Sequence, residues 1–562
     1  MDAYSVSYTS PSLRGSSRIY QDLAAYRQAT RNRIGQKAEQ LNMDFLEKLR
    51  KPRPSKPPRI GIVGAGISGL RCADVLLQNG FDVTILEGRD RIGGRTHQAT
   101  LPSGHLVDLG PNWIHGTESN PILDLTKETS TPTHTWEEQV NIFDENGKVL
   151  QNGSSLTEAM WGIIVQAFKY SAQNTANIDP KKSLHDFFLE KVQETLPGEE
   201  NSEQQRKIVM QMAELWGAFV GSPVETQSLK FFWLEECIDG ENLFCAGTYK
   251  SILALIAKPA LEKAKLRLST KIIKLETKPN AITLTAEDGS ESEFDEVVVT
   301  SPLGWLKINK PAFHPPLPTR LSQAIDSIGY GSLEKIYITF PRAFWLKDGA
   351  KPEDQFTGFT QWLSPIYAPD TNPSKWNQEA VDMATLPIPC AHPTLLFYIF
   401  GDQSVSLSTD LAALPSEKEK QAHLTRFFKP YFSKLPYYEE GSKDCLPVAC
   451  LATNWVADEL AGYGSYSTFR TGLQKGDEDI EIMREGLPDQ HLWFAGEHVA
   501  PFVALGTVTG AYWSGEAVGK RIADAYGMAQ VDKDDFNPEE INSNDGSKEV
   551  NVRGFADKAL EE

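Results

Sequence analysis

The stretch from Arg59 to Arg95 constrains the fold of this chain more than any other. It opens with a short apolar run at 60–63, which is typical of a buried parallel strand. The G-x-G-x-x-G spacing follows at 64–69, and apolar residues then recur at helical spacing up to residue 77. A second apolar run at 81–86 ends at an acid, Glu87. This order predicts a βαβ unit that binds a dinucleotide.

Each part of this unit has a physical role. Gly64 allows the tight turn, Gly66 lets a pyrophosphate approach the backbone, and Gly69 allows close packing of helix on strand. The helix N-terminus offers free N–H groups to the phosphates. Glu87 can accept hydrogen bonds from ribose hydroxyls, which favours FAD or NAD over NADP. A glycine-rich turn in an ordinary α/β protein would share the spacing, but not the strand, helix and acid around it.

The length and the net charge of the chain limit the number of domains and the kinds of partner that are expected. A chain of 562 residues exceeds one core, so two or more domains are expected. The net charge of −19 argues against a nucleic-acid partner and is compatible with cationic small molecules. The apolar runs are too short for a membrane helix, so no membrane partner is expected. Partner proteins are not indicated.

The six cysteines lack metal-ligand spacing, so neither a metal site nor a disulfide framework is expected. The chain lacks an apolar leader at its start and a peroxisomal signal at its end, so a cytoplasmic location is expected. The basic, proline-rich stretch at 51–58 is interpreted as a stiff linker, with a nuclear address as the alternative.

Hydrophobic periodicity predicts elements along the rest of the chain. Helices are expected at 19–50, 122–126, 156–172, 183–191, 207–219 and 417–432. Strands are expected at 266–276 and 281–286 as an antiparallel pair, and at 294–300, 331–340 and 394–400. The proline-rich stretch 346–390 is expected to be mostly loop, and the tail from residue 532 is acidic and polar.

Two motifs identify a resemblance. E-x-R-D-R-I-G-G-R at 87–95 and D-L-G-x-N-W-I-H-G at 108–116 resemble segments of the flavin-dependent amine oxidases, in the branch of polyamine oxidases and lysine-specific histone demethylases. Further matches are W-x-x-D at 455–458, G-S-Y-S at 464–467 and the segment 492–515. The resemblance covers about residues 57–525.

The resemblance implies an α/β fold with a Rossmann-type, GR2-like FAD-binding domain and an interleaved α+β substrate-binding domain. The FAD-binding domain would comprise 57–130, 240–325 and 445–527, and the substrate-binding domain 131–239 and 326–444. Residues 1–56 would form an N-terminal extension and 528–562 an acidic tail.

The cofactor implied is FAD, held without a covalent bond, because Ser465 stands where monoamine oxidases carry the cysteine that attaches it. Ile272 would lie by the adenine, and the helix that starts near Thr507 would direct its N–H groups at the flavin. The cofactor-binding residues expected are Gly64, Gly66, Ser68, Gly69, Glu87, Gly88, Arg89, Gly94, Arg95, Gly110, Asn112, Trp113, Ile272, Glu497, Thr507 and Val508.

Five residues are expected at the reacting centre. On pattern alone, Lys335 on its strand would face solvent; the resemblance implies instead that it holds a water against flavin N5. Tyr466 and Trp455 would form aromatic walls, with Thr507 at the second position of a half-open cage. His115 could hydrogen-bond the substrate amine, and plain packing is the equal alternative.

The implied reaction oxidises a polyamine-like or secondary amine. A hydride equivalent passes to flavin N5, the imine hydrolyses, and O₂ is reduced to H₂O₂. Glu118 or Glu225 could anchor a distal ammonium, although each is more typical of a surface carboxylate. Trp345 is expected in the core. Two alternatives stay open: an L-amino-acid oxidase or pathway-specific flavin dehydrogenase, and a methyl-lysine demethylase or other chromatin-associated flavoprotein.

Overall fold

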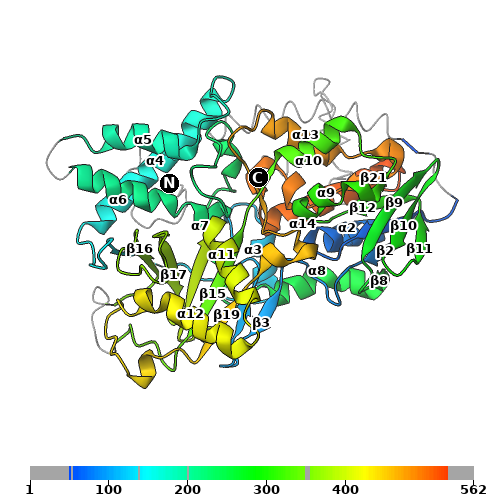
Figure 1. Ribbon diagram of the computed structural model, residues 1–562. Coiled ribbons are helices and arrows are strands. Elements are labelled where there is room, and N and C mark those ends of the chain that lie inside the picture. Colours follow the sequence, from blue (N-terminus) through cyan, green and yellow to red (C-terminus); the bar gives the residue numbers. More distant parts are fainter. Residues whose placement is uncertain (1–49, 52–54, 137–139, 199–201, 348–354, 530–562) are drawn as a thin grey trace, which may run out of the picture.

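The computed structural model describes residues 50–51, 55–136, 140–198, 202–347 and 355–529 (Figure 1). The helix expected at 19–50, apart from Arg50, and the tail from residue 532 lie outside these ranges. Among the described residues, no helix is long and apolar enough to cross a membrane.

A five-stranded parallel sheet holds the opening motif. Its order is β21-β12-β1-β2-β8, and every neighbouring pair is parallel. The strands are β1 (Arg59–Val63), β2 (Asp82–Leu86), β8 (Lys265–Arg267), β12 (Glu296–Val299) and β21 (Leu492–Phe494). Helix α2 (Ile67–Gln78) follows the glycine turn and leads to β2. The predicted βαβ unit is therefore confirmed.

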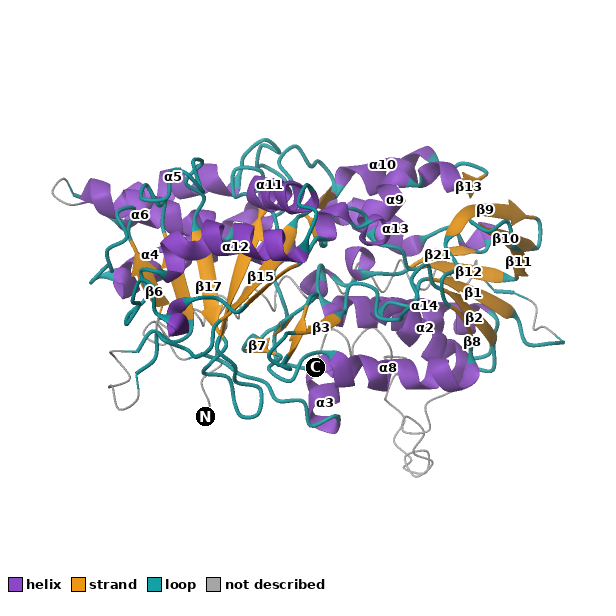
Figure 2. Ribbon diagram, turned by 60° about the horizontal axis from the view of Figure 1, so that its bottom comes forward, coloured by secondary structure: helices purple, strands orange, loops and turns teal. Residues whose placement is uncertain are grey.

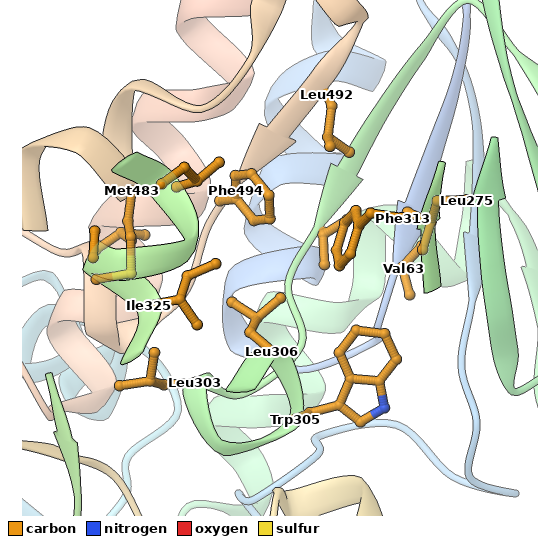
Figure 3. Packing of buried hydrophobic residues seen from close by; sticks show 14 of the residues in the cluster. Val63, Leu275, Leu303, Trp305, Leu306, Phe313, Ile325, Met483, Leu492 and Phe494 are labelled. Atoms are coloured by element: carbon orange, nitrogen blue, oxygen red, sulfur yellow. The ribbon is translucent and has the colours of Figure 1, made fainter. Parts of the chain in front are cut away.

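Each face of this sheet carries its own core, because the strand side chains alternate between faces. On one face, Ile60 and Ile62 pack with α2, α8 (Lys250–Lys263) and α14 (Val508–Ala525). On the other, Val63 packs with a four-stranded sheet of order β11-β10-β9-β13 and with three helices (Figure 3). These elements are β9 (Ile272–Lys278), β10 (Ala281–Ala286), β11 (Glu291–Phe294), β13 (Phe313–His314), α9 (Leu303–Ile308), α10 (Thr319–Ser327) and α13 (Gly476–Glu485).

Two strand predictions here need correction. The stretch 266–276 is not one strand: β8 belongs to the parallel sheet beside β2, and β9 starts at Ile272 in the other sheet. Between them Ser269 has a φ of 49°, and its N–H donates to the Arg89 carbonyl, which turns the chain. The alternating pattern runs across this turn without a break, so periodicity alone could not locate it. Similarly, 294–300 is divided between the end of β11 and β12.

A six-stranded mixed sheet forms the other large unit of structure (Figure 2). Its order is β19-β15-β18-β17-β16-β6, with β6 and β16 parallel and the other neighbours antiparallel. The strands are β6 (Val140–Phe143), β15 (Leu333–Thr339), β16 (Phe359–Trp362), β17 (Gln378–Asp382), β18 (Thr394–Phe400) and β19 (Ala449–Ala452).

The two faces of the six-stranded sheet have different neighbours. Ile336 and Ile338 pack under α12 (Glu417–Phe432), beside α11 (Gly401–Ala412). Tyr337 and Tyr398 lie on the opposite face, with Phe244 and Trp113. Helices α4 (Gly153–Asn174), α5 (Leu184–Thr195) and α6 (Ser202–Glu214) lie at the β6–β16 end (Figure 1), whereas α7 (Gly217–Val220) contacts β18.

The other predictions are mostly confirmed. The helices at 122–126, 156–172 and 183–191 appear as α3 (Pro121–Glu128), α4 and α5, while 207–219 divides into α6 and α7. The stretch 346–390, expected to be mostly loop, contains β16 and β17, and β6 has no counterpart among the predicted strands. The remaining strands form three small pairs: β3 (Gln98–Thr100) with β4 (Leu106–Asp108), β5 (Trp113–Ile114) with β7 (Leu243–Phe244), and β14 (Gly329–Tyr330) with β20 (Ser467–Thr468). The domain limits stay a prediction.

Candidate active site

A cavity of about 330 Å³ is enclosed by residues of both large sheets. Every residue predicted to bind the cofactor or to lie at the reacting centre is part of its wall, except Gly69. These residues come from segments hundreds of positions apart: the turn after β1, the loops at 87–95 and 108–115, strands β9 and β15, and the loops before α14.

Gly66 and Gly69 have different surroundings in the glycine turn after β1. A Cβ on Gly69 would lie 2.1 Å from the Gly64 carbonyl oxygen, so only glycine lets α2 pack on the turn. A Cβ on Gly66 would meet no atom within 4 Å, because this residue borders the open cavity. Gly64 has a φ of 110°, which favours glycine. The turn is therefore tightly packed against α2 at Gly69 and open to the cavity at Gly66.

Glu87 is held at the end of β2 with its carboxylate at the cavity. Oε2 accepts the Ala65 N–H at 2.7 Å, and Oε1 accepts the Arg89 N–H at 2.8 Å. Each carboxylate oxygen can accept a second hydrogen bond, so capacity remains for two further donors. Ile272 lies in the same cavity wall.

Arg95 and Glu497 form a charged pair in the wall. Arg95 Nη1 donates to Glu497 Oε1 at 3.0 Å and to the Ser465 carbonyl at 2.6 Å. Burial alone would raise the pKa of Glu497, but Arg95 and the Ser467 hydroxyl, at 2.6 Å, hold it below its ordinary value. Glu497 is therefore a carboxylate at neutral pH. Arg89 makes a two-pronged contact with Asp458, at 2.9 Å to each oxygen.

Lys335 is buried and lines the cavity, so the solvent-facing position that its strand pattern favours is wrong. Its Nζ donates to the Gly110 carbonyl. Burial lowers the pKa of Lys335 to about 8, against the opposing charges of Asp108 and Glu334.

A row of side chains crosses the six-stranded sheet next to this lysine. Lys335 on β15 is opposite Tyr398 on β18, Tyr398 is opposite Glu379 on β17, and Glu379 is opposite Gln361 on β16. Directly opposed residues of neighbouring strands share a face. The first three line the cavity.

The loop that carries Trp455 is bound to the lysine strand. The Thr453 hydroxyl accepts the Lys335 N–H at 2.8 Å and donates to Glu334. Glu334 also accepts the Val456 N–H at 2.9 Å. Trp455 Nε1 donates to the Leu109 carbonyl at 3.1 Å. Glu334 and Thr453 are not among the residues predicted for the site, because no sequence motif connects them.

The other predicted catalytic residues also border the cavity. The Tyr466 hydroxyl donates to the Phe219 carbonyl at 2.7 Å, and burial raises its pKa. Burial lowers the pKa of His115 to about 4, so its imidazole is neutral at physiological pH. Thr507 caps α14 by accepting the Gly510 N–H at 2.9 Å.

Three other residues lie away from the cavity. Glu118 and Glu225 are exposed and do not line it. Trp345 is buried in the core and donates to Asp382 at 3.0 Å.

Two carboxyl groups in the wall were not predicted from the sequence. Glu235 and Glu379 both line the cavity, and burial raises their pKa values to about 8 and about 7. Glu379 lies in the stretch 346–390, which is expected to be mostly loop, so no periodic pattern predicts the direction of its side chain. Together with the aromatic walls, these groups make the cavity suited to a polar or cationic organic molecule.

Comparison with known proteins points to one family. A family model described as flavin containing amine oxidoreductase matches residues 67–523. The probable polyamine oxidase 4 of Arabidopsis thaliana is 27% identical over 466 residues, which cover 81% of this chain and 85% of that protein. Lysine-specific histone demethylase 1 homolog 1, also from Arabidopsis thaliana, is 26% identical over 80% of this chain and 50% of that protein.

A solved structure has the same fold. A double mutant of putrescine oxidase, redesigned in cofactor binding, superposes with a TM-score of 0.59 at 19% identity. The match covers 84% of this chain and 100% of that chain. The family match extends over most of the sequence and includes the segments that enclose the cavity. The chain therefore belongs to the flavin-containing amine oxidoreductases.

Proposed function

We propose that this protein is an FAD-dependent oxidase that acts on a polyamine-like or secondary amine, with O₂ as the electron acceptor. The observation that carries the proposal is the single cavity that joins the glycine turn and Glu87 to Lys335, Tyr466 and Trp455. The similarity to proteins named polyamine oxidases supports the same substrate class.

The residues of the wall fit FAD. The open space at Gly66 would accept a pyrophosphate, and the free acceptor capacity of Glu87 would take the ribose hydroxyls. The residues that would hold the group are Gly64, Gly66, Ser68, Glu87, Gly88, Arg89, Gly94, Arg95, Gly110, Asn112, Trp113, Ile272, Glu497, Thr507 and Val508.

The proposed binding is non-covalent. The Ser465 hydroxyl has no hydrogen-bond partner among the described residues and lies in the cavity wall. A serine hydroxyl there can donate to a bound group, whereas attachment at this position in monoamine oxidases uses a cysteine. Acid precipitation separates the two cases, because a non-covalent flavin stays in the supernatant.

When bound, the flavin supplies a two-electron acceptor for the C–H next to the amine nitrogen. The chain's own residues hold the amine neutral and in place. Tyr466 and Trp455 would wall the reacting nitrogen, and neutral His115 would exchange a hydrogen bond with it. Lys335 would hold the water used for imine hydrolysis or the O₂ step, and the N-terminus of α14 presents a positive dipole end to the cavity.

An H₂O₂-coupled assay with an amine panel tests this proposal. The purified, flavin-loaded protein is given polyamines, N-acetylated polyamines, simple secondary amines, L-amino acids and a methyl-lysine peptide. Peroxide with the polyamines or secondary amines is expected. Peroxide with only the amino acids or the peptide would select one of the two alternatives and overturn the proposal, as would no peroxide at all.

A further inference from the structure

A second, smaller cavity adjoins the main one at the far end of the row that runs from Lys335 to Gln361, where Glu379 and Gln361 line it. Its volume is about 50 Å³, and it lies between β16, β17 and helices α4 and α6. The two cavities share part of their walls, namely Trp113, Trp216, Phe219, Phe359 and Glu379. Glu379 therefore stands at the junction. We call the smaller space the side cavity.

The junction is rich in acceptors. Gln361 Nε2 donates to Glu379 Oε2 at 2.8 Å, while the buried Gln361 Oε1 accepts no hydrogen bond from the described residues. Glu379 is 5% exposed and has no ion-pair partner in the described part of the chain. Buried acceptors of this kind cost free energy unless a donor reaches them. The pair therefore fits a ligand group that donates hydrogen bonds.

Aromatic rings around the junction favour a positively charged donor. Trp113 stacks on Phe359, with centroids 6.0 Å apart and planes 19° apart, and Trp136 meets both rings edge-on or tilted. The faces of such rings attract ammonium groups. A cation would also hold the Glu379 carboxyl in its ionised form, against the burial that raises its pKa.

The size and the lining of the side cavity limit which group can be attached to that charged nitrogen. Trp136, Met160, Trp161 and Met212 are part of its wall, and Glu379 is the only charged residue among the residues described there. A space of about 50 Å³ holds a few non-hydrogen atoms, since a cavity needs roughly 10–15 Å³ to hold one water. An apolar group of two to four atoms would fill it, whereas another ammonium would find no partner.

The strand register sets the spacing from the reacting centre. Glu379 is two strands away from Lys335, through Tyr398. Neighbouring strands lie about 4.8 Å apart, so the two positions are roughly 10 Å apart along the row. Several methylene groups are needed to span this distance.

We propose that Glu379 and Gln361 form a subsite for a second, charged nitrogen of the substrate, and that the side cavity takes a short uncharged alkyl group on that nitrogen. The proposal rests on the proposed amine oxidase function. It assigns the preferred substrate to the N-alkylated di- or polyamines.

The test compares matched amines in pairs. The reference compounds are α,ω-diamines of increasing length. Each diamine is compared with its N-propyl derivative, with its N-acetyl derivative and with the monoamine of equal length. In the wild type, kcat/KM is expected to be highest for an N-propyl diamine and lowest for the monoamine. In Glu379→Gln, the ratio of kcat/KM for diamine over monoamine should fall at least about tenfold, because a charge-assisted hydrogen bond is lost.

A second variant isolates the side cavity. Met160→Phe narrows it, and should lower kcat/KM for the N-propyl diamine relative to the unsubstituted diamine. Glu225→Gln, which removes an exposed acid outside both cavities, should leave both ratios at their wild-type values. A wild type that prefers N-acetyl diamines, with unchanged ratios in Glu379→Gln, would overturn the assignment of a charged nitrogen.

Direct binding keeps this test separate from the proposed function. Isothermal titration is carried out without O₂ on the protein with its flavin chemically reduced, so that the amine binds but is not oxidised. The Kd for the N-propyl diamine should then rise at least about tenfold in Glu379→Gln. If no amine is oxidised but this difference in Kd is present, the proposed function fails and the subsite stands. If amines are oxidised and the Kd is equal in both proteins, the subsite is wrong.

Discussion

Arg95 and Glu497 lie 402 positions apart in the chain and form an ion pair with an Nη1–Oε1 distance of 3.0 Å. Glu497 is almost fully buried, and Arg95 also holds the carbonyl of Ser465 at 2.6 Å. The pair connects the loop after β2 with the loop after β21, on two sides of the same cavity. One contact therefore joins two segments that are predicted to bind the cofactor.

Replacement of Arg95 by Met should leave Glu497 buried without its cation. Removing one partner of a buried pair costs about 3–5 kcal/mol, so the free energy of unfolding should fall and flavin should be lost on gel filtration. Urea titration and the ratio of flavin to protein absorbance measure both effects. The double variant Arg95→Met/Glu497→Gln should recover part of the stability. An Arg95→Met protein as stable and as yellow as the wild type would contradict the prediction.

The two glycines of the turn after β1 should respond differently to alanine. Gly69→Ala would place a Cβ 2.1 Å from the Gly64 carbonyl, so it should destabilise the apoprotein by more than 1 kcal/mol, on the order of an overpacked core. Gly66→Ala has free space and a φ of −75°, so it should leave the apoprotein melting temperature almost unchanged while flavin binds more weakly. Equal effects of both variants on apoprotein stability would refute this division of roles.

Lys335→Met should keep the flavin bound and slow turnover. Its Nζ is directed at the Gly110 carbonyl within the cavity, and methionine fills a similar volume without donating a hydrogen bond. Stopped-flow measurements can separate anaerobic reduction of the flavin by amine from its reoxidation by O₂. Lys274→Met, on a partly exposed lysine outside the cavity, serves as the control. Wild-type rates in both half-reactions would remove Lys335 from the site.

Glu334→Gln should change how stability depends on pH. Burial raises the pKa of Glu334 to about 7 in the folded state, from an ordinary value of about 4.5. The folded protein thus retains a proton that the unfolded chain releases. Below pH 4.5 both states are protonated and the group has no net effect; as pH rises from about 4.5 to 7, the wild type loses stability relative to the variant.

The size of that effect follows from the shift. At about 1.4 kcal/mol per pKa unit, a shift from about 4.5 to about 7 makes the difference at most about 3.5 kcal/mol. Melting temperatures of both proteins between pH 4.5 and pH 8 give the measurement. A constant difference across this range would show that Glu334 does not titrate in the folded protein.

The local pattern predicted the elements whose residues are close in sequence. The glycine spacing, the helix after it and Glu87 lie within one short stretch, and the β15 and α12 periodicities are similarly local. Periodicity did not predict the elements that are defined by the strands they pair with. The strand expected at 266–276 combines most of β8 with β9, and no strand is expected at β16 or β17. A run of alternating residues specifies which side chains share a face, but it does not specify the neighbouring strand.

The sequence by itself therefore determined the dinucleotide unit and the segments that resemble the flavin amine oxidases, because glycine turns, helix starts and periodicity are short-range properties. Only the tertiary structure decided how the cavity is enclosed. The contacts that hold its wall together are the Arg95–Glu497 pair, the Thr453 contact with Lys335, and the row from Lys335 to Gln361. These contacts depend on the pairing and register of strands far apart in the chain. That pairing is set by the burial of whole faces, which no single stretch of sequence contains.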